Sequence, residues 1–596
     1  MTPSNYVANR RRVNKIKSDV AKYLRERKRK QEQTRIEQLL SGPQGHTNFW
    51  KAWSVLNGKQ STPSSEGPIR FEDETASSDS HKAKLFSEYL RKAHQKPPGL
   101  SDIESEANEF CKTIRTSPSI SETNVHGSAE VTKTEIEKFV KTLKPKAPGP
   151  DRVTNQQLRN LSPSAIEVLS RIFTSSLLLG VVPSSWKESV VVMVPKPNKP
   201  RDSPRSYRPI SLTSCLGKLF ECSVKKRFDQ WCESNKLYGL KQTAYRKGMN
   251  TNENLLRLTQ FASEALQWKE TCLVCFLDVE AAFDKVWHEG LLFKLSRKKC
   301  PEYLLRWISS YLDRRTLRVR VGVSLSDIVI IEAGVPQGGV LSPQLFIFYV
   351  GDMPQNRDQN SQYADDIAVW IRSRSVVLAA QAMQAFLRQF EAWSLTWKIN
   401  INASKSTLVA ISFQKFRRQD IEITLKAERI QVERSAMFLG VKIDEKLTWN
   451  DHVEYLRAQV AKRMFALRSL AAKNVSKDNL LLIYRLGIRS KLEYGLPAWR
   501  NCSASLVHDL EVMQTKTLRA ITWMPKCLGN DALLQYCGAS KIIRRIEDIS
   551  IKTLNKVRNR EDLQYLLLNK RQCPAISKKT PLCEVLNDET KLIQAG

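Results

Sequence analysis

The chain carries two distinct patterns of apolar and polar positions. Short continuous apolar runs predict buried strands, and they occur at residues 190–194, 272–277 and 367–370. Apolar residues at helical spacing predict helices over residues 9–40, 456–470 and 480–491. From residue 81 onward the two kinds of segment alternate without a repeating period, which argues against a repeat architecture.

Residues 57–80 interrupt this pattern. They are polar and rich in turn-forming Ser, Pro, Gly and Asn, so we expect a linker or a flexible loop there. The predicted helix of residues 9–40 is strongly basic. It fits a nuclear-import or RNA-binding arm, and it also fits an ordinary solvated helix face.

Charge is the first property that narrows the function. The 596 residues include 95 Lys and Arg against 61 Asp and Glu, a formal net charge of +34. Such an excess is larger than solubility requires and favours a polyanionic partner, although an acidic membrane surface or protein would also attract it. No apolar stretch approaches the roughly 20 residues of a membrane span. The N-terminus also lacks the apolar core of a secretory signal, so we expect a protein of the nucleus and cytoplasm.

Twelve cysteines are scattered without a disulfide framework, and we expect reduced thiols. Cys272 and Cys275 form a C-x-x-C pair in a predicted strand. Positions three apart on a strand point to opposite faces and cannot share one metal ion. The later cysteines, with His508, lack the close paired spacing of a zinc site, so a zinc knuckle is not expected.

Three aspartates carry the strongest chemical signal. Asp278 ends one apolar run, and Asp365 and Asp366 stand at a turn that leads into another. An Asp-Asp pair alone is usually a solvated turn, but apolar strands rarely carry acids for packing. Neighbouring carboxylates in a water-poor site stay ionised together only when a divalent cation neutralises them. We therefore predict ligands for two Mg²⁺ ions, or Mn²⁺, roughly 3.5 to 4 Å apart, in a nucleotidyl transfer site.

Weaker signals accompany the aspartates. Lys196 and Arg208 lie by neighbouring predicted strands and could grip a triphosphate, or they could be ordinary surface bases. Gln337 and Gly338 lie in a Gly-rich turn that opens an apolar helical segment. Paired glycines allow backbone to approach a ligand closely, but a plain strand-to-helix turn can have the same sequence.

Seven ordered segments together resemble a known family. They are KAPGPD (146–151), YRPIS (207–211), FLDVEAAFD (276–284), GVPQGGVLSP (334–343), YADD (363–366), NASKS (402–406) and FLG (438–440). In content, order and spacing they resemble the reverse transcriptases of non-LTR retrotransposons, especially the jockey-like group. The resemblance is specific over residues 136–450 and extends more loosely upstream and to about residue 545.

The resemblance implies which residues bind the metal ions and select the sugar. Asp278, Asp365 and Asp366 match the catalytic, metal-binding carboxylates of the family. Phe283 falls where the family places an aromatic steric gate that clashes with a 2′-hydroxyl and favours deoxynucleotides. Core packing is the alternative explanation for Phe283.

Five further residues match substrate contacts of the family. Lys196 and Arg208 match residues of the fingers that contact the triphosphate. Gln337, with Gly338, matches a position near the incoming nucleotide and template. Lys405 matches a candidate acid for the departing pyrophosphate.

The resemblance also implies a right-hand polymerase fold. This is an α+β architecture of fingers, palm and thumb, with an antiparallel palm sheet backed by helices and with helical N- and C-terminal extensions. The expected parts are a basic helical region (1–56), a linker and N-terminal extension of the fingers (57–135), fingers (136–260), palm (261–445), a helical thumb and post-polymerase region (446–545), and a C-terminal tail (546–596).

The implied activity is RNA-directed DNA synthesis, in which deoxynucleoside triphosphates are added to a DNA 3′-end on an RNA template. The alternatives are an inactive nucleic-acid-binding remnant of a mobile element and a host-adopted or maturase-like polymerase. Full-length relatives usually carry an N-terminal endonuclease, whereas this sequence begins in the basic region, so an endonuclease supplied in trans is an expected partner. The segment QTAYRKG (242–248) departs from the family pattern at Ala244 and Tyr245, which predicts looser local packing.

Overall fold

The computed structural model describes residues 67–98, 101–116 and 129–560, except 198, 240, 356–358, 474 and 526. It also describes seven single residues between 22 and 38, all of them helical, so most of the helix predicted over residues 9–40 lies outside the described residues. The chain divides into two compact units, one of residues 63–439 and one that includes everything from Gly440 onward.

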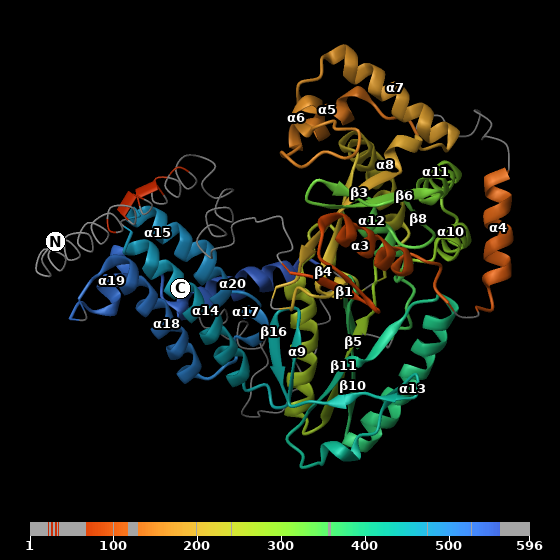
Figure 1. The fold of residues 1–596 in the computed structure, drawn as a ribbon. Helices are drawn as coiled ribbons and strands as arrows, with labels where there is room; N and C mark the ends of the chain where they lie inside the picture. Colours follow the sequence, from red (N-terminus) through yellow and green to blue (C-terminus); the bar gives the residue numbers. More distant parts are fainter. Residues whose placement is uncertain are drawn as a thin grey trace, which may run out of the picture. The chain divides into compact units, whose positions relative to one another are not determined.

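A five-stranded sheet forms the centre of the first unit (Figure 1). Its strands, in spatial order, are β14 (Gln431–Val432), β11 (Ile401–Ile411), β5 (Thr271–Val279), β10 (Asp366–Ser373) and β9 (Asn360–Tyr363). All neighbours pair antiparallel except β11 and β14, which are parallel. β5 reads as a continuous apolar run because it lies in the middle of the sheet, where both of its faces are buried.

Two helices pack on opposite faces of this sheet. The apolar side of α13 (Val376–Thr396) shares a core with Cys275 and Val369. Phe261 of α9 (Thr251–Gln267) contacts Trp370, which follows Val369 on β10 and therefore points to the other face. Figure 1 shows α9 and α13 on either side of the strands.

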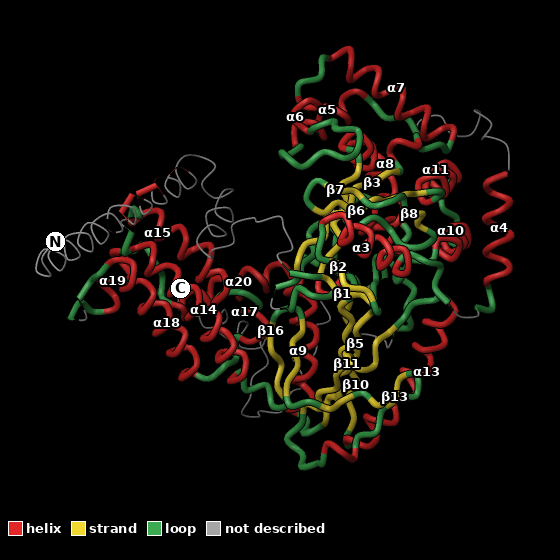
Figure 2. Tube along the Cα trace, viewed as in Figure 1, coloured by secondary structure: helices red, strands yellow, loops and turns green. Residues whose placement is uncertain are grey.

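A second sheet of the first unit is built around β3 (Figure 2). It contains β4 (Tyr207–Thr213), β3 (Glu188–Pro195), β6 (Arg315–Val321), β7 (Ser324–Leu325) and β8 (Val329–Ile331). β3 pairs antiparallel with β4 and parallel with β6. Helix α3 (Asp79–Ala93) covers one face, where Phe86 and Leu90 pack against Val191 and Val319.

The linker predicted over residues 57–80 is wrong for its described part. Residues 69–76 form a hairpin of β1 (Ile69–Phe71) and β2 (Glu74–Ala76), and α3 begins at Asp79. Ile69 and Ala76 are fully buried in the core under α3, and the Arg70 amide donates to the Asp202 carbonyl at 2.6 Å. Two buried apolar residues are enough for this hairpin because α3 and the second sheet supply the rest of its core.

The remaining elements of the first unit are mostly helices around one large core. They are α4 (Glu104–Thr116), α5 (Lys133–Thr142), α6 (Asn155–Arg159), α7 (Pro163–Leu179), α8 (Cys215–Ser234), α10 (His288–Arg297), α11 (Glu302–Leu312), α12 (Ser342–Tyr349), β12 (Thr424–Leu425), β13 (Glu428–Arg429) and β15 (Ser435–Phe438). Phe220 stacks on Phe173 at 4.4 Å and meets Trp307 edge-on at 5.3 Å, which ties α8 to α7 and α11.

The described part of the second unit is almost entirely helical. It contains β16 (Val441–Asp444), α14 (Asn450–Ala471), α15 (Lys477–Ile483), a π-helical segment (Tyr484–Arg489), α16 (Ser490–Leu492), α17 (Leu496–Trp499), α18 (Ala504–Thr522), α19 (Asn530–Tyr536) and α20 (Ile542–Arg558). The predicted helices over 456–470 and 480–491 are confirmed. Helix α20 crosses the expected boundary at residue 545, so the tail begins as helix.

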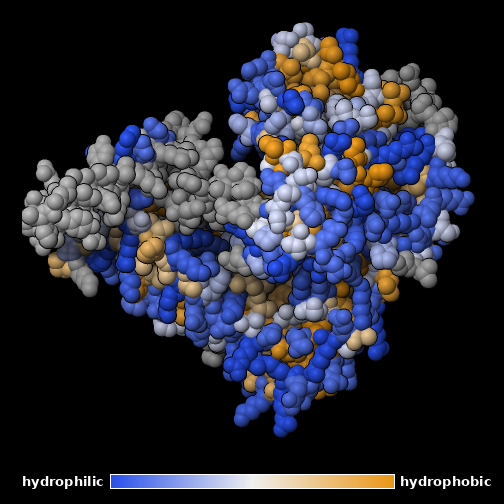
Figure 3. Space-filling view, viewed as in Figure 1, coloured by the Kyte–Doolittle hydropathy of each residue, from blue (hydrophilic) through white to orange (hydrophobic). Residues whose placement is uncertain are grey.

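The fold is thus a mixture of helices and sheets, as the α+β prediction requires. The visible surface is largely hydrophilic in both units, with exposed apolar side chains such as Val168 and Leu179 gathered along α7 (Figure 3). Among the residues that the structure describes, no helix is both long and apolar enough to cross a membrane.

Candidate active site

Two of the three predicted carboxylates lie directly opposite each other in the central sheet. Asp278, near the end of β5, pairs with Asp366 at the start of β10. Directly opposed residues of an antiparallel pair project from the same face, about 4.5 to 5.5 Å apart at Cβ. Asp365 precedes Asp366 in the turn from β9, next to Ala364, whose φ is 57°. The fold therefore brings the three aspartates together where β5 ends and β10 begins.

The electrostatics of this group fit a cation. Partial burial, followed by the charges of Asp365 and Asp278, raises the pKa of Asp366 to about 6. Burial and the charge of Asp278 also raise the pKa of Asp365. Both side chains still reach solvent, so an ion could approach them, and a divalent cation would remove the repulsion that raises these pKa values.

The carboxylates do not by themselves form a closed metal cage. Within the described ranges, no three His, Cys, Asp or Glu side chains converge closely enough to enclose an ion. Mg²⁺ typically takes one or two protein carboxylates and completes its shell with water and substrate phosphates. Carboxylate oxygens that are open to solvent at the ends of two strands fit that kind of site.

Lys405 reaches this group through an irregularity in β11. Asn402 pairs with Asp278, and the next pair is Thr407 with Phe276. Between these two pairs β11 has four residues and β5 has one, so β11 bulges by three extra residues. The Nζ atom of Lys405 lies 3.7 Å from Oδ2 of Asp278. The backbone N–H of Asp278 donates to Oγ of Ser406, which also lies in the bulge, at 3.2 Å. The bulge therefore both supports Asp278 and delivers a cation to it.

The turn that carries Asp365 is held by a buried glutamine that the sequence analysis did not identify as a site residue. Gln242 is fully buried, and its Oε1 accepts hydrogen bonds from the backbone N–H of Ala364 and of Ala244, both at 3.0 Å. Asn254 of α9 donates to the carbonyl of Gln362 at 2.7 Å. Gln242 is the first residue of the QTAYRKG segment, but Ala364, the residue it supports, is distant in the sequence.

The substituted positions of that segment are placed differently. Ala244 is fully buried, whereas Tyr245 is 48% exposed and has a φ of 59°. Burial, then the charge of Asp365, raises the pKa of Tyr245. Tyr245 therefore lies close to the carboxylate group.

Lys196 and Arg208 form a cationic group at the edge of the second sheet. Lys196 follows β3 directly, and Arg208 lies on β4 opposite Val194. The Nζ atom of Lys196 donates to the Arg205 carbonyl at 2.8 Å. Burial lowers the pKa of Lys196, and the positive charges of Arg208 and Lys405 lower it further. Arg208 and Lys405 are thus close enough to Lys196 to repel its charge, as expected where positive side chains form an anion-binding site.

The Gly-rich loop is attached to β4. The backbone N–H of Ser211 donates to the Gln337 carbonyl at 2.9 Å. Gly338 has a φ of 131°, and a Cβ atom there would lie 2.7 Å from the Ser211 carbonyl oxygen. Only glycine fits this close approach without strain. The loop then leads into α12, as the sequence predicted.

Phe283 follows the strand that carries Asp278 and contacts the start of the Gly-rich loop. It is half-buried and stacks on Phe346 of α12 with ring centroids 4.8 Å apart. Its carbonyl accepts from the backbone N–H of Val335 at 2.8 Å. The stacking on Phe346 fits core packing, and it would also fix the ring for a gating role. The steric gate therefore remains a prediction.

No described cysteine belongs to a cluster of three or more possible metal ligands. All ten cysteines among the described residues are free. Cys272 and Cys275 are fully buried on β5, and burial raises the pKa of both thiols. The expectation of reduced thiols is confirmed for the described part of the chain.

Comparison with known proteins agrees with this geometry. Residues 194–443 match the family described as "Reverse transcriptase (RNA-dependent DNA polymerase)". The chain is 30% identical over 524 residues to the "Probable RNA-directed DNA polymerase from transposon X-element" of Drosophila melanogaster, which covers 84% of this chain and 56% of that protein. It is 31% identical over 538 residues to the "RNA-directed DNA polymerase from mobile element jockey" of Drosophila funebris, covering 86% and 57%.

A more distant relative matches a shorter stretch. The "Retrovirus-related Pol polyprotein from type-1 retrotransposable element R2" of Popillia japonica is 31% identical over 223 residues, or 37% of this chain and 30% of that protein. The chain spans a little more than half the length of the X-element and jockey proteins. The family match and these relatives, together with the seven ordered motifs, show that the chain belongs to the reverse transcriptases of non-LTR retrotransposons.

Proposed function

We propose that this chain is an RNA-directed DNA polymerase that adds deoxynucleoside triphosphates to a DNA 3′-end on an RNA template. The observation that carries the proposal is the pairing of Asp278 with Asp366 across two buried strands, beside Asp365 in the adjoining turn. Nucleotidyl transfer needs positioning and electrostatic stabilisation more than covalent help from the protein. Carboxylates on a rigid sheet suit that requirement.

Within this proposal the five-stranded sheet belongs to the palm, β3 and β4 with the helices of residues 136–260 form the fingers, and the helices from α14 onward form the thumb. The strands β6, β7 and β8, expected in the palm (261–445), pair in one sheet with β3 and β4, so the expected boundary at residue 260 does not separate the two sheets. Reverse transcriptases generally use divalent metal ions, and Asp278, Asp365 and Asp366 would hold two Mg²⁺ or Mn²⁺ ions. Bound ions would activate the primer hydroxyl and neutralise the charge of the departing pyrophosphate.

The cationic side chains supply the complementary charge. Arg208 presents a planar fork and Lys196 a point charge, and both would bind the triphosphate. Lys405, whose Nζ is 3.7 Å from a carboxylate oxygen of Asp278, would give its proton to the pyrophosphate as it leaves. The closeness of the three cations supports this assignment.

Two further groups would select the substrate. Phe283 would exclude a 2′-hydroxyl, because its ring is fixed against Phe346 and cannot easily withdraw. Gln337 and Gly338 would contact the incoming nucleotide and the template from the loop attached to β4.

The proposed partners are an RNA template and a DNA primer or target. A net charge of +34 favours association with RNA as a ribonucleoprotein in the nucleus and cytoplasm. A helical thumb with interspersed Lys and Arg would hold the duplex by its backbone charge rather than by its sequence.

Primer extension tests the proposal. A DNA primer on an RNA template is incubated with the protein, Mg²⁺ and either deoxynucleotides or ribonucleotides. We expect extension with deoxynucleotides only, and we expect Asp365→Asn to abolish it while RNA binding stays within about twofold, because one metal-binding charge is lost and the basic surface is unchanged.

Asp420→Asn is the matched control, since Asp420 is exposed and lies outside the site. This variant should extend primers like the wild-type protein. Tight, salt-sensitive RNA binding without extension by the wild-type protein would contradict the proposal and identify an inactive remnant.

A further inference from the structure

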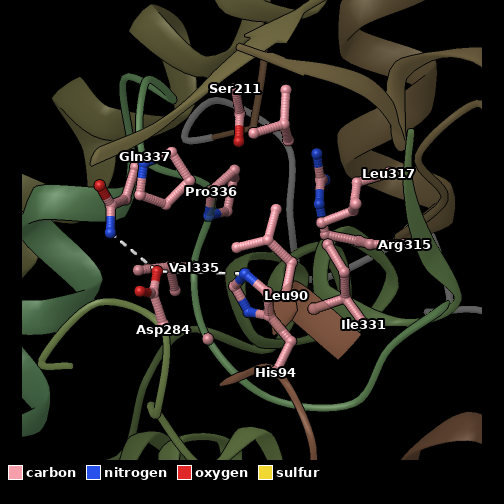
Figure 4. A pocket seen from close by; sticks show the side chains of 13 residues that line it. Leu90, His94, Ser211, Asp284, Arg315, Leu317, Ile331, Val335, Pro336 and Gln337 are labelled. Atoms are coloured by element: carbon pink, nitrogen blue, oxygen red, sulfur yellow. Dashed lines mark hydrogen bonds and ion pairs between the residues drawn. The ribbon is translucent and has the colours of Figure 1, made fainter. Parts of the chain in front are cut away.

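A small pocket lies beside the Gly-rich loop, between α3, β4 and the segment after β5 (Figure 4). Its wall includes Gln337, Asp284 and His94, which come from three segments far apart in the sequence. Figure 4 shows the three side chains in a row, with Asp284 between the other two. None of the motif assignments above gives Asp284 or His94 a role.

The first contact in this row fixes the orientation of an amide. Nε2 of Gln337 donates to Oδ1 of Asp284 at 2.8 Å. A carboxylate can only accept, so the nitrogen of the Gln337 amide must face Asp284 and its oxygen must point away. Figure 4 shows that oxygen on the far side from Asp284. Without Asp284 the amide could rotate and present either atom.

The second contact holds Asp284 from behind. Nε2 of His94 lies 4.0 Å from the same Oδ1 atom, and the side chains of His94 and Asp284 are 8% and 14% exposed. The other ring nitrogen, Nδ1, lies 2.9 Å from the Ala333 carbonyl oxygen. Because a carbonyl only accepts, Nδ1 carries a proton, and Nε2 attracts the carboxylate when it is protonated as well, in the imidazolium form.

His94 is itself anchored at the base of the Gly-rich loop. It caps the C-terminus of α3, and its carbonyl accepts from the backbone N–H groups of Glu332 and Ala333 at 3.1 and 2.9 Å. Gly334 follows with a φ of 92°, and a Cβ atom there would lie 2.8 Å from Nδ1 of His94 and 2.6 Å from the Asp284 carbonyl oxygen. The row is therefore packed too tightly for its members to move independently.

We propose that Asp284 is a positioning residue that acts through Gln337, with His94 holding Asp284 in place. The inference rests on the proposed function, because Gln337 is taken to contact the incoming nucleotide. With one of its two amide N–H groups engaged by Asp284, Gln337 directs its carbonyl oxygen away from Asp284. That oxygen is an acceptor for a nucleotide group that presents a donor, such as a sugar hydroxyl or a base amino group.

A double-mutant cycle tests this role. The measured quantity is the Kd of a deoxynucleoside triphosphate for the complex of protein, RNA template and dideoxy-terminated primer, which requires no chemical step. We expect Asp284→Ala and Gln337→Ala each to weaken nucleotide binding about tenfold, with primer-template affinity unchanged. In the Gln337→Ala background, Asp284→Ala should add less than about twofold, because its target is already missing.

Two conservative variants separate positioning from folding. Asp284→Asn keeps an acceptor oxygen for Nε2 of Gln337 and should recover most of the affinity lost in Asp284→Ala. His94→Asn keeps a donor for the Ala333 carbonyl but lacks Nε2, so it should weaken binding by a smaller factor that also vanishes in the Gln337→Ala background.

Equal effects of Asp284→Ala in both backgrounds, or an Asp284→Asn variant as weak as Asp284→Ala, would overturn the inference. A wild-type protein that binds the nucleotide but never extends a normal primer would instead contradict the proposed function. The two failures are thus distinguished, the first by nucleotide binding to the dideoxy-terminated complexes and the second by extension of a normal primer.

Discussion

The substitution Gln242→Leu isolates the support of the turn that carries Asp365. Gln242 is fully buried and accepts two backbone hydrogen bonds, from Ala364 and Ala244, each at 3.0 Å. Leucine fills a comparable volume without an acceptor. The change therefore leaves two buried N–H groups without their partner while the apolar packing is largely kept.

The free-energy cost of Gln242→Leu follows from the loss of those two hydrogen bonds. A buried donor left unpaired costs about 1–3 kcal/mol, so the pair costs about 2–6 kcal/mol. Ala364 has a φ of 57°, a conformation that costs a non-glycine residue roughly 1–2 kcal/mol. We expect the turn to relax rather than stay strained and unpaired. Since 1.4 kcal/mol in a barrier is about tenfold in rate, extension should slow at least about tenfold.

Two measurements check this expectation. Single-turnover extension gives the rate, and amide hydrogen exchange over residues 360–366 reports the opening of the turn. Gln384→Leu is the matched control, because Gln384 makes a similar pair of bonds, to the N–H and carbonyl of Thr424 at 2.8 and 3.0 Å, away from the site. Wild-type extension and unchanged exchange in Gln242→Leu would refute the reasoning.

Three further predictions concern selectivity, stability and binding. Phe283→Ala should lower the preference for deoxynucleotides over ribonucleotides about tenfold or more, measured as a ratio of kcat/KM values, and an unchanged ratio would leave Phe283 only its packing role. Burial raises the pKa of Glu493, but hydrogen bonds from Arg545 and Arg489 outweigh burial and lower that pKa below its ordinary 4.5. As pH falls, the unfolded state is protonated first, so this stabilisation is complete above pH 4.5 and is lost through the lower folded pKa. Glu493→Gln should therefore cost about 2 kcal/mol in urea unfolding at pH 7, and a deficit that does not shrink below pH 4 would contradict this account. Raising salt from about 50 to 200 mM should weaken RNA binding about a thousandfold, and a change below tenfold would mean that few phosphates are contacted.

Strands buried on both faces could be predicted from the sequence because their signal is local. The continuous apolar run around residue 274 became β5, and the run around residue 192 became β3. Their pairing could not be derived in the same way. Residues 278 and 366 are far apart in the chain, and periodicity places an acid on a strand without saying which strand lies beside it.

The polar residues that support the site could not be predicted from the sequence. Gln242 and Asp284 serve partners 122 and 53 residues away, respectively. A buried glutamine and an exposed one look alike in a sequence, because the burial comes from distant segments. The hairpin at residues 69–76 was missed for a related reason, since Ile69 and Ala76 are too few to form a pattern until α3 covers them.

The three extra residues of β11 have a consequence for how this chain tolerates change. On a regular strand, inserting or losing one residue moves every side chain that follows to the opposite face. Here the bulge between Asn402 and Thr407 sits outside that alternation, so Lys405 approaches Asp278 by the length of a loop rather than by strand register. A substitution at the exposed Ser404 should therefore be absorbed locally, whereas Ala403 is buried in the core. Deleting a single codon in this stretch would draw the lysine away from the carboxylate while leaving every residue of the site present.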